Sequence, residues 1–176
     1  MLSMALLFPI ARWLAGYLPA TIHPMILHFP IVLLYLCAGL EVLALVLPPT
    51  DGFLHRAAFW TLTLACVAII VTMSAGLVSE QSVHWTKTTS LILSHHQRFA
   101  VFTGLTAGAG WLAHVGNRFP RGKRWGLWGR GRASLVSALF VVASAAFVTL
   151  TAHLGGQMVY HYGVGVVGVT RIKPGV

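Results

Sequence analysis

Three of the nine histidines, His28, His96 and His153, lie at the ends of three different apolar segments of the sequence. Neutral imidazole is the commonest metal ligand in proteins and a frequent axial ligand of haem iron. Helix bundles build such sites from side chains that project inward from facing helices. If the three segments are helices of one bundle, these imidazoles lie at about the same level. We therefore predict a bis-histidine haem b site or a small metal site there.

The predicted axial pair of the haem iron is His28 with His96, and His153 can replace either of them. The sequence alone does not decide whether His95 or its neighbour His96 points inward. A simpler interpretation stays open for all of these residues, since imidazole is amphipathic and is tolerated where a helix meets the membrane surface. His28 could equally bond to backbone carbonyl groups or lipid headgroups at the mouth of the first segment.

One face of the third apolar segment carries small residues between two histidines: His96, Ala100, Thr103, Ala107, Gly110 and His114. On a helix, about five turns separate the two histidines, a rise of roughly 27 Å. Small residues along such a face favour close packing against another helix. They would also leave a groove for a flat cofactor with His96 at its outer end, and both interpretations stay open.

Glu41 is the one carboxylate within an apolar segment, and it follows His28 on the first of them. Ionisable side chains at such a depth are rare, and they usually face the interior of the bundle and serve a function. The sequence therefore marks Glu41 as a candidate for a proton path. A structural hydrogen bond from Glu41 to another helix is an equally open interpretation.

The composition indicates an integral membrane protein. Of the 176 residues, 57% are apolar and only 9% are charged, and the mean hydropathy is +0.79. A soluble domain carries about 25% charged residues, so this chain has too little charge for a surface that faces water. The two cysteines, Cys37 and Cys66, lie within apolar segments. They lack the CxxC and CxxCH spacings of zinc ribbons and of covalent c-type haem.

A helix that crosses a bilayer needs about 20 mostly apolar residues. Four segments meet this requirement, at about 25–47, 57–78, 96–116 and 133–154. We therefore expect an all-α integral membrane fold, a four-transmembrane-helix bundle that forms one domain over residues 21–168. Residues 1–20, with Arg12 and Trp13, fit a short interfacial helix better than a signal peptide. Residues 169–176 form a tail.

The positive charge is concentrated in one segment between the third and fourth spans. Six of the twelve basic residues lie in it: Arg118, Arg121, Lys123, Arg124, Arg130 and Arg132. Basic loops between spans stay on the cytoplasmic side and attract anionic lipid. The net charge of +9 therefore does not indicate nucleic acid. We expect both termini, and most of the histidines, on the opposite, periplasmic side.

The stretch HPMILHFPIVLL, residues 23–34, opens the first span with two histidines and two prolines. Pro24 suits the first turn of a helix, while Pro30 cannot donate a hydrogen bond to the carbonyl of Ile26. The helix is therefore kinked near Pro30 or begins there after a separate turn. Either arrangement fixes the backbone around His28, as a ligand requires.

This stretch resembles the opening of an uncharacterised bacterial family of four-helix membrane proteins, whose members begin approximately HPxLVHFPIAL. The closing motif of that family, approximately GGxLVYxHGVGV, is similar to GGQMVYHYGVGV at residues 155–166. The two motifs enclose about residues 20–168. The opening histidines of the family fall on His23 and His28, whereas its closing histidine falls on Tyr162.

The resemblance implies a four-span fold and either electron transfer or association with cytochromes. Together with the histidines, it favours a b-type haem protein of the bacterial inner membrane, alone or as the membrane subunit of a redox complex. Expected partners are the lipid bilayer, a periplasmic cytochrome or dehydrogenase subunit, and quinol. Two alternatives stay open: a metal or proton transporter that uses the outer histidines and Glu41, and a structural or assembly subunit without a cofactor. No nucleophile motif accompanies the histidines, so a stand-alone enzyme is not expected.

Overall fold

The computed structural model describes residues 13, 16–17, 19, 21–47, 52–118 and 130–166, with the side chains of 117–118 and 130–134 left aside. Within these residues the fold is entirely helical. The elements are α2 (Ile22–Ile26), α3 (His28–Val46), α4 (Phe53–Glu80), α5 (Lys87–Arg118), α6 (Arg130–Gly156) and the π-helical turn η2 (Gln157–His161).

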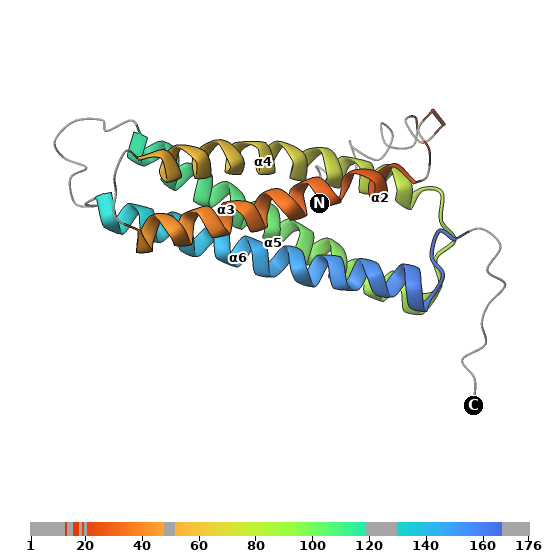
Figure 1. The fold of residues 1–176 in the computed structure, drawn as a ribbon. Coiled ribbons are helices and arrows are strands. Elements are labelled where there is room, and N and C mark those ends of the chain that lie inside the picture. The colour runs from red at the N-terminus through yellow and green to blue at the C-terminus, as the bar shows by residue number, and fades with distance from the viewer. Residues whose placement is uncertain are drawn as a thin grey trace.

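The four long helices run side by side as an antiparallel bundle (Figure 1). Helix α3 packs against α4 and α6, and α5 packs against α6 and α4. We call the end formed by α2, residues 81–86 and η2 the histidine end. The opposite end, where α3 and α5 finish and α4 and α6 begin, is the basic end.

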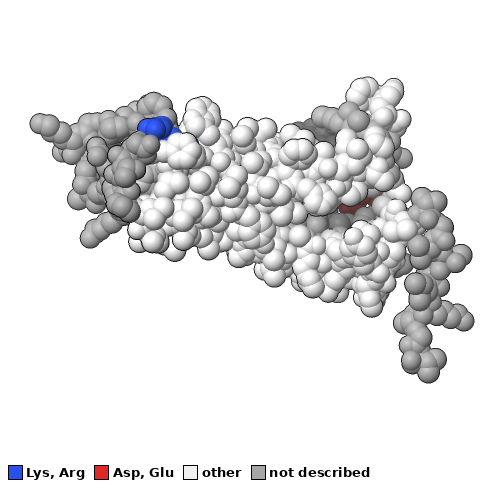
Figure 2. Space-filling view, in the orientation of Figure 1, with Lys and Arg blue, Asp and Glu red and all other residues white. Residues whose placement is uncertain are grey.

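Each of the four bundle helices is long and apolar enough to cross a membrane, over Ile22–Val46, Phe53–Glu80, Lys87–Gly116 and Leu135–His161. Large apolar side chains cover the outside of the bundle, among them Val32, Ile70, Leu105 and Leu139. The face drawn in Figure 2 is uncharged along its middle. Such a surface suits lipid rather than water. The expected four-transmembrane-helix bundle is therefore confirmed.

The interior of the bundle combines aliphatic and small residues. Fully buried side chains include Leu34, Leu62, Ala65, Ala107 and Val141. A Cβ atom added at Gly110 of α5 would lie 3.2 Å from Cγ2 of Val141 on α6. The small-residue face of α5 therefore packs directly against α6, and the alternative of a cofactor groove is not formed there.

Helix α5 begins at Lys87, whereas the sequence predicts a third span from about residue 96. Two threonines cap the earlier start. Oγ1 of Thr86 accepts a hydrogen bond from the backbone N–H of Thr89, at 3.3 Å, and Oγ1 of Thr89 accepts one from the N–H of Thr86, at 2.9 Å. This reciprocal arrangement is a capping box with threonine in place of the usual Glu or Gln. Because of this earlier start, the connection between α4 and α5 consists only of residues 81–86.

A break at Leu27 separates α2 from α3. Pro30 has no N–H, so it leaves the carbonyl of Ile26 without its helical donor. A regular helix is therefore interrupted just before this proline. The structure is closest to the expected separate turn, although the main helix begins at His28 rather than at Pro30.

Three expectations fall largely outside the described residues. The interfacial helix at 1–20 is described only at residues 13, 16–17 and 19. The tail at 169–176 and the centre of the basic segment, residues 119–129, are not described.

Candidate functional site

Two imidazoles meet at the histidine end of the bundle, one from His23 on α2 and one from His96 on α5. Their ring centroids are 6.2 Å apart, and their planes are nearly perpendicular, at 81°. Both residues are half-buried. We call these two residues the imidazole pair.

His23 is fixed by α4. Its Nδ1 donates to the backbone carbonyl of Thr72, at 3.0 Å, and its backbone N–H donates to Oγ of Ser79, at 3.4 Å. The ring lies against Gly76, where an added Cβ would come within 3.3 Å of Nδ1. The imidazole therefore fits against α4 because residue 76 has no side chain.

His96 is fixed in the same way by α6. Its Nδ1 donates to the carbonyl of Thr151, at 2.8 Å. The ring lies against Gly155, where an added Cβ would come within 3.4 Å of Cε1. In both halves the glycine follows the threonine by one helical turn. The two halves thus repeat one arrangement. In each, a histidine bonds to a threonine carbonyl of a neighbouring long helix, α4 or α6, and covers a glycine of that same helix.

The carbonyl partners decide which ring nitrogen carries a hydrogen. A carbonyl oxygen only accepts, so Nδ1–H is the donor in both rings. In a neutral imidazole, Nε2 then keeps its lone pair. Neither Nε2 takes part in a hydrogen bond within the part of the chain that the structure describes. Metal-binding histidines commonly have this arrangement, with one ring N–H held by a carbonyl and the other nitrogen directed to the metal.

The separation of the two rings suits one metal ion between them. With metal–nitrogen bonds of about 2.0 Å on both sides, two imidazole centroids lie about 6 Å apart, and the observed separation is 6.2 Å. Each ring can rotate about its own metal–nitrogen bond, so perpendicular planes are compatible with such a site. Among the described residues, no group of three or more His, Cys, Asp or Glu could hold a metal ion. The site therefore offers two imidazoles and not a full ligand set for a bare ion.

The bundle is hollowed at the histidine end, and an acidic side chain lies in the hollow (Figure 2). Glu80, the last residue of α4, lies at this end of the bundle and is half-buried. Oε2 of Glu80 accepts a hydrogen bond from Nε2 of Gln97, at 3.0 Å. Gln97 directly follows His96 of the imidazole pair in the sequence.

A second polar group lies towards the basic end. Oε1 of Glu41, on α3, accepts a hydrogen bond from Oγ of Ser137 on α6, at 2.9 Å, and contacts Nε2 of His114 on α5. The structural hydrogen bond between helices that the sequence leaves open is thus present. Within the described residues, Oε2 of Glu41 is the one buried side-chain nitrogen or oxygen without a hydrogen-bond partner.

The chain matches one family model over residues 19–168, and that family is described as "Predicted membrane protein (DUF2231)". The match covers most of the 176 residues. The chain belongs to this family. The resemblance of its opening and closing motifs to an uncharacterised membrane family is thereby confirmed. No curated protein and no solved structure matches the chain.

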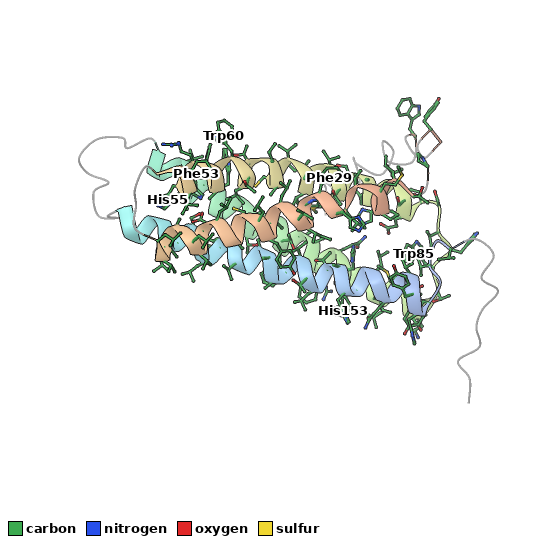
Figure 3. All side chains as sticks on the ribbon, in the orientation of Figure 1. Phe29, Phe53, His55, Trp60, Trp85 and His153 are labelled. Atoms are coloured by element: carbon green, nitrogen blue, oxygen red, sulfur yellow. The ribbon has the colours of Figure 1, made fainter. Side chains whose placement is uncertain are left out.

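In this DUF2231 chain, the expected ligands are only partly brought together. His96 lies in the imidazole pair, but its partner there is His23 and not His28. His28 is exposed, since the five residues from His23 turn its side chain by about 140° around a helix. His153, on α6 in Figure 3, is also exposed, and its Nε2 lies 3.1 Å from Nε2 of Gln157.

Of the neighbours His95 and His96, the second faces the site, and His95 is exposed. The signal that sequence reasoning missed is a shared pattern, TMSAG at 72–76 and TAHLG at 151–155. Each supplies a threonine carbonyl and a glycine one turn apart. Small and hydroxyl residues are common where membrane helices pack, so neither pentapeptide stands out by itself.

Proposed function

We propose that the protein binds one haem b between His23 and His96 and passes electrons at the histidine end of the bundle. The observation that supports this most is the repeated geometry of the two imidazoles. Each has its Nδ1–H held by a carbonyl of a neighbouring helix, and each leaves Nε2 without a hydrogen bond. An axial ligand needs a fixed direction and a basic nitrogen, and both follow from this arrangement.

The number of protein ligands favours haem over a bare metal ion. A porphyrin supplies four equatorial nitrogens, so two imidazoles complete the coordination of its iron. Zinc sites use about three or four protein ligands, and the described residues contain no such group. The hollow at the histidine end offers an approach for a large group.

A haem held by both His23 and His96 would supply electron transfer rather than the binding of oxygen. The carbonyls of Thr72 and Thr151 would hold the two rings during a change of oxidation state. The protein thus supplies orientation and tunes the potential, while the haem carries the electron.

The proposed orientation follows from the basic segment between α5 and α6, which would keep the basic end in the cytoplasm. The histidine end and both termini would then face the periplasm of a bacterial inner membrane. A periplasmic cytochrome or dehydrogenase subunit could exchange electrons with the haem there, and quinol could supply them from the lipid.

The test is a dithionite-reduced minus oxidised visible spectrum of the full chain, purified in detergent from haem-replete cells. The proposal predicts sharp α and Soret bands and a pyridine haemochrome typical of haem b. A featureless spectrum would exclude haem. Metal analysis of the same sample would then separate a metal transporter from a structural subunit without a cofactor.

A further inference from the structure

We propose that Glu41 and His114 form a proton-binding site near the basic end of the bundle. The site does not depend on the haem proposed above. His96 and His114 lie on the same helix, eighteen residues apart, so about 27 Å of rise separates the two sites.

Both members of this pair are removed from the surface. The side chain of Glu41 is 0% exposed and that of His114 is 10% exposed. Oε1 of Glu41 is occupied, because Oγ of Ser137 donates to it at 2.9 Å and Nε2 of His114 contacts it. Oγ of Ser137 also lies 3.4 Å from the carbonyl of Gly110, which holds the serine in place. The carboxyl group is therefore fixed from two neighbouring helices.

Burial determines the charge that the pair can carry at rest. An ionised carboxylate alone in an apolar interior is strongly unfavourable. One proton between Oε1 of Glu41 and Nε2 of His114 makes the pair neutral as a whole, whichever atom holds it. The resting pair therefore contains one proton.

Oε2 of Glu41 is the position for a further proton. It has free lone pairs, it is buried and it has no donor among the described residues. In the binding step, a hydronium ion at the membrane surface gives up its proton, an O–H bond forms at Oε2, and water remains. The charge of the pair rises from zero to +1. The ring of Phe59, whose centroid lies 6.0 Å from that of His114, is within range of a cation–π interaction with the imidazolium.

The proton comes from the basic end, which is the nearer surface. His114 precedes Arg118, the last residue of α5, by about one turn, a rise of about 6 Å. Glu41 precedes Val46, the last residue of α3, by a rise of about 8 Å. His114 is the partly exposed member of the pair, so exchange with water passes through it.

Few other titratable groups lie around the pair. Those on the helices that pack around it are Cys37 on α3 and His55, Arg56 and Cys66 on α4, while Arg118 of α5 and Arg130 and Arg132 of α6 lie where side chains are not described. The thiol of Cys37 donates to a carbonyl of α4, at 3.5 Å. His55, labelled near the basic end in Figure 3, is the one other imidazole of this end and serves as a control.

The test is infrared spectroscopy of the full chain in lipid nanodiscs, with glutamate labelled with ¹³C. The chain contains two glutamates, Glu41 and Glu80. In the variant Glu80→Gln, the isotope-shifted carboxyl bands report Glu41 alone, so Glu41 itself need not be changed. Spectra are recorded as the pH is varied between about 4 and 9, a range that includes the ordinary titration of carboxyl and imidazole groups.

We expect an isotope-shifted carboxylic C=O band whose intensity rises on acidification. In Glu80→Gln with His114→Gln, the pH dependence of this band should change, because Oε1 of Glu41 has lost its contact with Nε2 of His114. The addition of His55→Gln should leave the titration unchanged. Circular dichroism checks that each variant is folded.

Three results would overturn the proposal. The first is a C=O band of Glu41 that does not change over the pH range in which the protein is folded. The second is a titration that is the same with and without His114. The third is a band that responds to Na⁺ at constant pH and not to pH itself, which would identify a metal-cation site instead. Presence or absence of haem in the same samples affects none of these outcomes.

Discussion

The imidazole pair differs from the other histidines in the use of its ring nitrogens. In His23 and His96, Nδ1–H is held by a backbone carbonyl, whereas His28 and His153 are exposed. Position in the sequence does not make this distinction, because all four residues lie near one end of the apolar segments. Rotation around the helix axis and a glycine on the facing helix decide it. The sequence therefore predicts the level of the site and His96, but not His23.

Gly155→Ala should displace the ring of His96, because the added Cβ would lie 3.4 Å from Cε1. With haem bound, the angle between the axial imidazole planes should change. The low-spin EPR signal of the ferric protein depends on that angle and should shift. Gly39→Ala is the matched control, since nothing lies within 4 Å of a Cβ at this position. Identical signals from both variants would contradict the packing of the imidazole on glycine.

His114→Leu should destabilise the bundle more than a loss of packing alone, because it leaves Glu41 buried without its partner. Breaking a buried ion pair costs about 3–5 kcal/mol, whereas apolar replacement of both members costs much less. We therefore expect the double variant Glu41→Leu/His114→Leu to be more stable than His114→Leu. Equilibrium unfolding in mixed detergent micelles measures the difference. A double variant that is no more stable than the single one would show that the two residues are not coupled.

At the scale of the helices, α5 and α6 pack through small and hydroxyl residues. Oγ of Ser144 donates to the carbonyl of Thr103, at 2.9 Å, between the two helices. Membrane helices commonly pack in this way, because small residues let the backbones approach. The sequence shows the small residues but not the helix that they meet, so it leaves a cofactor groove open where the structure has a packed interface.

Gly110→Ala should push α5 and α6 apart, because the new Cβ would lie 3.2 Å from Cγ2 of Val141 and 3.4 Å from Cβ of Phe140. Overpacking of this kind costs about 1–3 kcal/mol. Gly108→Ala is the control, since nothing lies within 4 Å of a Cβ there, and alanine favours the helix over glycine. Thermal unfolding followed by circular dichroism compares the two. Equal melting temperatures would be inconsistent with the tight approach at Gly110.

The existence of the four spans follows from hydropathy, because lipid requires long apolar helices. Their ends do not follow from it. Helix α5 begins at Lys87 because Thr86 and Thr89 cap it, whereas hydropathy along the sequence predicts the span only from about residue 96. The break at Leu27 depends on Pro30. A proline can either kink the helix or separate the preceding turn from it, so the sequence alone does not fix where the break lies.

At the scale of the molecule, the two halves of the bundle repeat one arrangement around the imidazole pair. His23 bonds to α4 across 49 residues, and His96 bonds to α6 across 55 residues. The repeat rests on one histidine, one threonine carbonyl and one glycine in each half. Few residues carry the repeat, and the histidine and threonine are separated by different numbers of residues in the two halves. The repeat is therefore visible in the structure but not in the sequence.

The arrangement of four spans predicts that both termini lie on one side of the membrane and residues 119–129 on the other. By the positive-inside rule, we expect the basic segment in the cytoplasm. Paired alkaline phosphatase and green fluorescent protein fusions should therefore report periplasmic termini and a cytoplasmic segment. Cytoplasmic termini would invert the orientation and move the imidazole pair to the other side of the membrane.

The measurement that tests the central claim most directly is the reduced minus oxidised spectrum of four single variants. They are His23→Ala, His96→Ala, His28→Ala and His153→Ala, all purified from haem-replete cells. The first two variants should lose the α and Soret bands, and the last two should retain them. Loss of the bands in His28→Ala, with retention in His23→Ala, would contradict the assignment of the ligands.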